Sequence, residues 1–159
     1  MKTRILFVCL GNICRSPAAE GILKAMVREE GREADFLIDS AAIGPWHVGQ
    51  LPDPRMRRCG RRHGYQFDSR ARQVSAADFD RFDMIMAMDD ENYAALSRMA
   101  PTDEARRKIH KMSALLSAHP GVKAVPDPYY GNDSDFDWAV ELLEDACRML
   151  LSRIPKKLV

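Results

Sequence analysis

Hydrophobic and polar positions near the N-terminus predict a strand, a tight loop and a helix in succession. Residues 5–9 form an apolar, β-prone run, which is typical of a strand buried on both faces. Gly11 and Asn12 interrupt this run, and Ser16-Pro17 has the form of a helix start with proline at the first helical position. Apolar residues then recur at helical spacing until Gly31, so the helix has one face for burial.

The same alternation continues to the C-terminus. Further strands are predicted at residues 36–40, 84–88 and 122–125, with an irregular edge segment at residues 66–68. Helices are predicted at residues 54–63, 76–82 and 105–116, from residue 89 onward, and after the capping residue Ser134. Strands that alternate with helices predict a three-layer α/β fold, in which helices flank a mainly four-stranded parallel sheet.

The composition favours one domain covering residues 1–159, because 46% of the residues are hydrophobic and can form a core without disulfides. The net charge of +1 argues against nucleic acid as a partner, since nonspecific binding needs a strong basic excess. Arginines gather between Arg55 and Arg72, either on a solvated face or as a positive rim for an anionic substrate. No run is long and apolar enough to cross a membrane, and residues 5–8 are too few for a signal peptide, so we expect no membrane partner.

Four cysteines stand at positions 9, 14, 59 and 147. A chain this rich in core residues needs no disulfide scaffold, so we expect reduced thiols and a cytoplasmic location. No Cys-x-x-Cys pair and no His/Cys cluster with zinc spacing is present in the sequence. We therefore expect neither a metal nor another cofactor.

The chemically most informative segment is Cys9–Ser16, which fits the pattern Cys-x5-Arg-Ser. The spacing alone is weak evidence, because Cys147 and Arg153 also stand six residues apart. That second pair lies in a predicted helix, where six residues turn two side chains about 240° apart. We interpret the second match as a coincidence.

The context of Cys9 favours an anion-binding loop. Gly11 and Asn12 can adopt the unusual backbone angles of a tight turn, which directs successive N–H groups inward. The helix that follows adds the positive end of its dipole, and Arg15 can hold two phosphate oxygens. The same donors stabilise a thiolate, so Cys9 is predicted to be a nucleophile. The alternative is an inert cysteine packed at a strand end.

Attack of a thiolate on a phosphate ester requires an acid that protonates the leaving oxygen. Only eight residues precede Cys9, so this acid must lie downstream. Asp127 is the best candidate, because prolines flank it and Tyr129 and Tyr130 can form walls for an aryl group. The pattern alone leaves open that Asp127 is an ordinary turn residue.

Residues 8–17 and 127–130 together resemble the low-molecular-weight protein tyrosine phosphatase family. Similar segments cover essentially the whole chain, including residues 39–40, 46–49, 52–55, 88–89 and 131–133. The resemblance implies a flavodoxin-like sheet and metal-independent hydrolysis of protein phosphotyrosine and small aryl phosphates. It also implies that phosphate or another oxyanion binds in the active site.

The resemblance further implies individual roles. Cys9 would form a phosphocysteine, Arg15 would hold the phosphate, and Asp127 would act as general acid and then as general base. The phosphate-binding loop would comprise Leu10, Gly11, Asn12, Ile13, Cys14 and Ser16. A supporting hydrogen-bond network would include Asn12, Ser16, Ser40 and His63, and the pocket walls would include Leu10, Ile13, Trp46, Tyr129 and Tyr130.

Three residue assignments remain open at this level. The resemblance implies a protective Cys9–Cys14 disulfide, which requires Cα atoms within about 7 Å, whereas Cys14 alone suggests a small packing residue. The position of His63 before Gly64 favours a role at a helix end rather than in the loop. Many bacterial family members read Ser-Ala-Gly-Thr-Gly at residues 40–44, so Ala42 and Ile43 leave the local loop shape open.

Two rival functions fit parts of the pattern. An arsenate reductase needs two further cysteines as a disulfide relay, and none lies between Cys59 and Cys147. A noncatalytic phosphate-binding module would lack the cysteine or the acid, and both are present. A nucleotide-binding P-loop is excluded, because the chain has no Gly-Lys-[Ser/Thr] motif.

Overall fold

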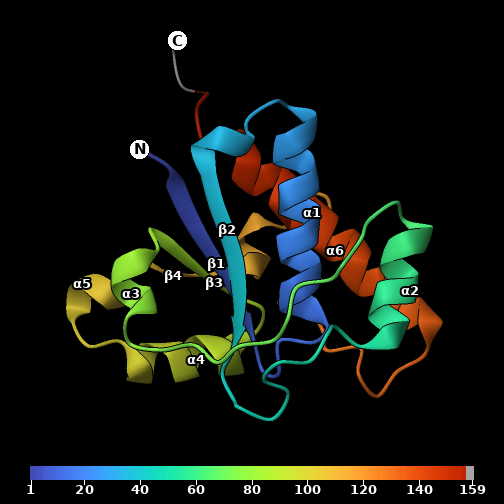
Figure 1. Cartoon of the computed structure of the whole chain (residues 1–159), viewed down its shortest axis with the longest axis horizontal. Helices are drawn as coiled ribbons and strands as arrows, with labels where there is room; N and C mark the ends of the chain where they lie inside the picture. The colour runs from blue at the N-terminus through green and yellow to red at the C-terminus, as the bar shows by residue number, and fades with distance from the viewer. Residues whose placement is uncertain (157–159) are drawn as a thin grey trace.

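The computed structural model describes residues 1–156 and contains a four-stranded parallel sheet (Figure 1). The strands are β1 (Thr3–Cys9), β2 (Phe36–Ala42), β3 (Met84–Ala87) and β4 (Ile109–Lys111), in the order β2-β1-β3-β4. All three neighbouring pairs are parallel. This arrangement confirms the predicted flavodoxin-like sheet.

The helices connect these strands and cover the sheet. They are α1 (Arg15–Glu29), α2 (Pro54–Arg62), α3 (Asp78–Arg81), α4 (Asp90–Met99), α5 (Asp103–Arg106) and α6 (Asp133–Ser152). Two short 3-10 helices, η1 (Glu33–Asp35) and η2 (Met112–Leu115), precede β2 and follow β4. No helix in the described part is of the length and apolar character that would cross a membrane.

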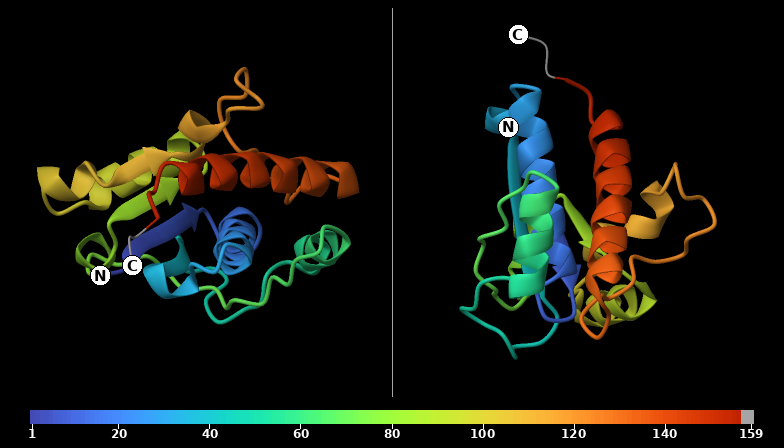
Figure 2. Two further views of the ribbon diagram at one scale, coloured as in Figure 1. Left: turned by 90° about the horizontal axis from the view of Figure 1, so that it is seen from above. Right: turned by 90° about the vertical axis from the view of Figure 1, so that its right-hand side faces the viewer.

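Alternate residues of β1 enter two different cores. Ile5, Phe7 and Cys9 belong to the core formed with α1, α2 and α6. Leu6 and Val8 belong to the core formed with α3, α4 and α5. Because successive strand residues point to opposite faces, the buried part of β1, residues 5–9, needs apolar residues at every position. Figure 2 shows α1 and α6 running alongside one another on the first face.

Two predicted elements are wrong. Residues 105–116 were expected to form one helix, but they contain the end of α5, strand β4 and helix η2. Residues 122–125 were expected to form the last strand, but β4 occupies that place beside β3. Ile109 is buried while His110 is exposed, and a strand of three residues is too short to carry a recognisable period.

The start of α6 differs from the prediction by two residues. Asn132 rather than Ser134 is the capping residue, and its side chain accepts hydrogen bonds from the backbone of Ser134 and Asp135. The Asp135 side chain in turn accepts from the Asn132 N–H, which completes a capping box. Asn132 and Ser134 are both good caps, so the sequence alone does not choose between them.

Candidate active site

Asn12 has the unusual backbone conformation that makes the tight turn in the loop between β1 and α1. Its φ of 58° lies in the left-handed region, where asparagine is tolerated better than most residues. The Asn12 side chain donates to Ser16 Oγ (2.7 Å) and to Ser40 Oγ (2.9 Å), and it accepts from the Arg72 N–H (3.1 Å). Three hydrogen bonds therefore hold the strained residue. Gly11 serves close packing instead, since a Cβ there would lie 3.0 Å from the His47 ring.

The loop leaves a series of backbone donors unused. In the part of the chain that the structure describes, no backbone N–H from Gly11 to Arg15 donates to a protein acceptor. Cys9, which is 3% exposed, lies at the base of this loop. Its Sγ is 3.0 Å from Ser16 Oγ and accepts from the Ser16 N–H at 3.4 Å. These N–H groups form a cradle suited to an anion.

Arg15 is the first residue of α1 and is only 2% exposed. Its Nη1 donates to Asp89 Oδ2 (2.7 Å) and to the Val125 carbonyl (3.0 Å). Burial acts to lower the pKa of Arg15, but the negative charges of Cys9, Asp89 and Asp127 raise it above its ordinary value. The guanidinium is therefore a permanent cation with a fixed orientation.

Asp127 belongs to the loop between η2 and α6 and is brought to the same place. Its Oδ2 lies 3.7 Å from Arg15 Nη2, and its side chain is 41% exposed. Its Oδ1 accepts from the Tyr129 N–H (3.1 Å), which orients the carboxylate. The Val125 N–H donates to the Met88 carbonyl, so this loop is attached to the end of β3.

A cavity of about 270 Å³ joins these residues. It is lined by Cys9, Leu10, Gly11, Ile13, Cys14, Arg15, Trp46, His47, Asp127, Tyr129 and Tyr130. A thiol, a buried cation and a carboxylate thus meet in one pocket with aromatic walls, at the carboxyl ends of β1 and β3.

Residues 4–159 match the family model described as low molecular weight phosphotyrosine protein phosphatase. The enzyme of that name from Sus scrofa is 40% identical over 151 residues, with 94% of each chain covered. The low molecular weight protein-tyrosine-phosphatase of Streptomyces coelicolor is 40% identical over 158 residues, covering 97% of this chain and 94% of its own. The chain belongs to the low-molecular-weight phosphotyrosine protein phosphatase family.

Solved structures agree with this assignment. A crystal structure of the protein tyrosine phosphatase from Entamoeba histolytica superposes with a TM-score of 0.92 at 42% identity, with 96% of each chain covered. The protein described here is therefore a phosphatase of a hydrolase family, with the fold that the sequence predicts.

A chain of hydrogen bonds supports the phosphatase loop from behind. Ser40, which is 2% exposed, accepts from Asn12 and donates to Glu20 Oε1 (2.6 Å). Lys24 Nζ donates to the other Glu20 oxygen at 2.6 Å. Ser40 thus lies where the sequence analysis expected it, and Glu20 is a further member that sequence reasoning missed.

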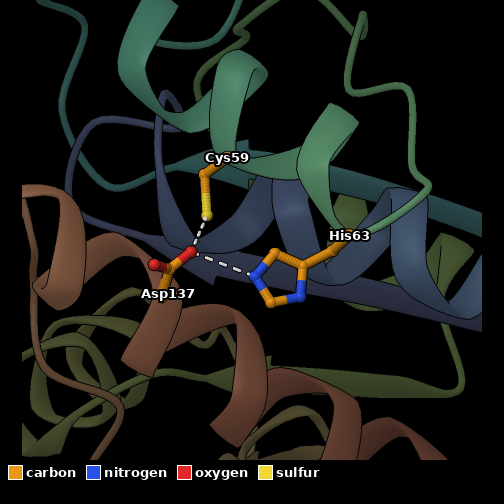
Figure 3. A group of neighbouring side chains, drawn as sticks. All are labelled: Cys59, His63 and Asp137. Carbon is orange, nitrogen blue, oxygen red and sulfur yellow. Dashed lines mark hydrogen bonds and ion pairs between the residues drawn. The ribbon is translucent and has the colours of Figure 1, made fainter.

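His63 does not join this network. It is the C-cap residue of α2, and its Nε2 lies 3.0 Å from Asp137 Oδ1 on α6 (Figure 3). Among the described residues it makes no hydrogen bond to the loop, so the position implied by the resemblance is wrong. The helix-end position that the residues alone suggested is confirmed. The physical reason is that His63 lies at the C-terminal end of α2, beside α6, whereas the opposite end of α2 contacts the loop through the hydrogen bond from the Asp53 N–H to the Ile13 carbonyl.

The aromatic walls of the phosphatase pocket differ in exposure. Trp46 is 64% exposed and Tyr130 is 94% exposed. The aliphatic wall residue Ile13, in contrast, is buried. The rings of Tyr129 and Tyr130 meet edge to face, with centroids 4.9 Å apart. The Trp46 ring packs directly over Gly44, so a Cβ at this position would displace the ring from its present place. The exposed rings are free to contact a substrate side chain.

No site role was predicted from the sequence for Asp89, which holds Arg15, or for His47, which lines the phosphatase pocket. The sequence places Asp89 at a predicted helix start and in a family-like segment without a role in the site, yet its two oxygens bind Arg15 and the Asn92 N–H. Its position directly after β3 is the signal that could have found it, since strand ends gather at one edge. His47 lines the cavity and packs on Gly11, and the signal that could have found it is its place beside Trp46 in the family-like segment 46–49.

The remaining cysteines of the phosphatase are buried and free. Burial and the nearby Asp53 carboxylate raise the pKa of Cys14, so its thiol stays protonated. Cys147 is fully buried in α6, with its Sγ facing the Ala19 carbonyl at 3.8 Å. The second Cys-x5-Arg match is therefore a core residue of a helix, as predicted.

The arginine-rich stretch is mostly held by internal contacts. Arg55 pairs with Asp53 (2.8 Å), Arg62 pairs with Asp137 (3.0 Å), and Arg72 binds both Asp39 and Asp78. These contacts favour a structural role over a free positive rim. The Ala42-Ile43 departure also leaves the loop intact, because the Ile43 N–H donates to the Cys9 carbonyl at 3.0 Å.

Proposed function

We propose that this phosphatase hydrolyses protein phosphotyrosine and small aryl phosphates through a phosphocysteine on Cys9, without a metal. The observation that carries the proposal is the meeting of Cys9, Arg15 and Asp127 in one cavity, although Asp127 follows Arg15 by more than a hundred residues. A pocket with exposed aromatic walls suits an aryl group better than a small aliphatic ester.

In the first step, the Cys9 thiolate attacks phosphorus, and the bond between phosphorus and the tyrosine oxygen breaks. Asp127 gives its proton to that leaving oxygen. Arg15 and the free N–H groups of residues 11–15 bind the phosphoryl oxygens, on which negative charge accumulates. The Ser16 hydroxyl and N–H stabilise the sulfur as an anion when it leaves again.

In the second step, the Asp127 carboxylate takes a proton from water, and the oxygen of that water attacks the phosphocysteine. The phosphorus–sulfur bond breaks, inorganic phosphate leaves, and the Cys9 thiolate and protonated Asp127 are restored. A thiolate nucleophile needs a reducing environment, so we also propose that the protein acts in the cytoplasm.

The first test compares wild type with Cys9→Ser on phosphotyrosine peptide and p-nitrophenyl phosphate, in the presence of a chelator. We expect Cys9→Ser to lose turnover, since serine lacks an activated anion. Cys147→Ser is the matched control, because Cys147 is buried in the core away from the cavity. Turnover by Cys9→Ser at the wild-type rate would disprove the mechanism.

The second test uses Asp127→Asn, which keeps an oxygen for the Tyr129 N–H but has no proton to give. We expect a fall of roughly a hundredfold or more in kcat on phosphotyrosine. The fall should be smaller on p-nitrophenyl phosphate, whose leaving group needs less protonation. An equal loss on both substrates would contradict the role of Asp127 as general acid.

A further inference from the structure

Cys59, His63 and Asp137 form a compact group of possible metal ligands away from the phosphatase cavity (Figure 3). The Cys59 Sγ, a ring nitrogen of His63 and a carboxylate oxygen of Asp137 all lie within 4.8 Å of one another. The active-site chemistry above uses none of the three.

The backbone explains why the three atoms meet. Cys59 and His63 are four residues apart at the end of α2, and this spacing puts them on the same helix face. Asp137 is in the second turn of α6, which packs against that face. Two ligands from one helix turn and a third from a neighbouring helix are a common way to build a zinc site.

We propose that Cys59, His63 and Asp137 bind one Zn²⁺ ion, with water as the fourth ligand. Thiolate, imidazole and carboxylate are the three side-chain ligands that zinc accepts, and a soft sulfur ligand disfavours Mg²⁺ and Ca²⁺. Asp137 Oδ1 lies 3.1 Å from Cys59 Sγ and 3.0 Å from His63 Nε2. Atoms at that separation need only small movements to share a cation at about 2.0–2.3 Å.

Binding exchanges hydrogen bonds for coordination bonds. Without the ion, Asp137 Oδ1 accepts from Cys59 Sγ, from His63 and from Arg62 Nη2 at 3.0 Å. When Zn²⁺ binds, the Cys59 thiol releases its proton to solvent, and the resulting thiolate coordinates the ion. The Arg62 side chain is 41% exposed, so it can swing away into water.

The site would join two helices that are each connected to a segment lining the phosphatase pocket. The N-cap of α2, Asp53, donates its N–H to the Ile13 carbonyl of the phosphate loop at 2.8 Å. Helix α6 begins three residues after Tyr130. An ion between α2 and α6 would therefore link one helix whose N-cap contacts the phosphate loop to another that follows the Asp127–Tyr130 segment, and the inference does not depend on the proposed catalytic mechanism.

The test uses a Cys9→Ser/Cys14→Ser parent, which removes the two thiols of the active-site cavity. Co²⁺, a spectroscopic substitute for Zn²⁺, is titrated into this protein. We expect one equivalent to bind, with a sulfur-to-cobalt charge-transfer band that one equivalent of Zn²⁺ abolishes. Adding Cys59→Ser should remove the band, and adding Cys147→Ser should leave it unchanged.

Further variants distinguish the loss of a metal ligand from the loss of folding. Far-ultraviolet circular dichroism shows whether each variant is folded. His63→Gln and Asp137→Asn should each weaken Zn²⁺ binding at least about tenfold, whereas Asp133→Asn, on the same helix, should not. Arg62→Ala should strengthen binding by removing the competing cation, with Arg61→Ala as its control. Absence of a charge-transfer band in the parent, or an equal band with Cys59→Ser, would overturn the proposal.

Discussion

At the scale of single residues, the site depends on a few side chains that each satisfy two partners. Asp89 holds Arg15 with one oxygen and caps α4 with the other. Asn12 also has two kinds of partner: its amide nitrogen donates to Ser16 and Ser40, and its amide oxygen accepts from the Arg72 N–H. A buried cation such as Arg15 is stable only where its donors find acceptors, so the loss of one partner is costly.

Asp89→Asn separates the two tasks of this residue. Asparagine caps a helix as well as aspartate does, so α4 should keep its cap, but the buried Arg15 loses a charged acceptor and the thermal midpoint should fall. The loss of the carboxylate facing Arg15 should lower kcat/KM on aryl phosphates by roughly tenfold or more. Asp90→Asn, an exposed neighbour on the same turn, is the control, and equal kinetics in the two variants would contradict this role.

Some of these site residues can be predicted from the sequence, and others cannot. Cys9, Asn12, Arg15 and Ser16 lie within eight positions, so their spacing predicts a single loop. His63 and Asp137 are 74 residues apart, and no local pattern indicates which distant acid a histidine will meet. The misplacement of His63 follows from that, since a polar contact between helices leaves no period in the sequence.

At the scale of elements, long segments were predictable, and so were the short α3 and β3, but β4 was not. The apolar face of α1 and the continuous apolar run of β1 each give a clear period. Strand β4 has three residues, and its backbone is fixed by β3 rather than by its own sequence. Pairing with β3 therefore determines that the segment between α5 and η2 is a strand.

The loop after η2 is attached to α6 by one buried carboxylate. Asp145 accepts from Ser117 Oγ, from the Ala118 N–H and from His119 Nδ1. Burial acts to raise the pKa of Asp145, but these donors lower it below the ordinary 3.8. The folded state thus favours the ionised form, so this stabilisation is present above pH 3.8 and is lost as pH falls through the folded pKa.

Asp145→Asn should therefore lower the free energy of unfolding at pH 6 by about 1–3 kcal/mol. Its stability should also depend less on pH below 4 than that of wild type. Urea unfolding at a series of pH values measures both effects. Asp68→Asn, at an exposed position, should behave as wild type, and a parallel loss there would refute the assignment.

At the scale of the whole molecule, the sheet brings distant segments to one edge. Parallel strands place the ends of β1 and β3 side by side, so residues 9–16, 89 and 125–130 meet there. The two cores hold the sheet rigid beneath that edge. Sequence patterns could predict this edge because strand–helix alternation fixes which ends face the same way.

Core packing should accordingly change stability without changing the chemistry of the site. Leu143 in α6 is fully buried, and Leu143→Ala should cost about 2–5 kcal/mol in urea unfolding. Glu141→Ala, on the exposed face of the same helix, should cost less than about 0.5 kcal/mol. Below the unfolding transition, kcat of both variants should match wild type; a large fall in kcat for folded Leu143→Ala would contradict this separation.

The Asp89 carboxylate and the Val125 carbonyl immobilise the Arg15 guanidinium before any ligand arrives. Ordering a free arginine on binding costs about 0.5–1.5 kcal/mol in conformational entropy. Here folding has already fixed that rotamer, so an incoming oxyanion meets a template that does not need to rearrange. Discrimination between anions should then depend on how well their shape fits the cradle, because a rigid cation cannot adjust to a poor fit.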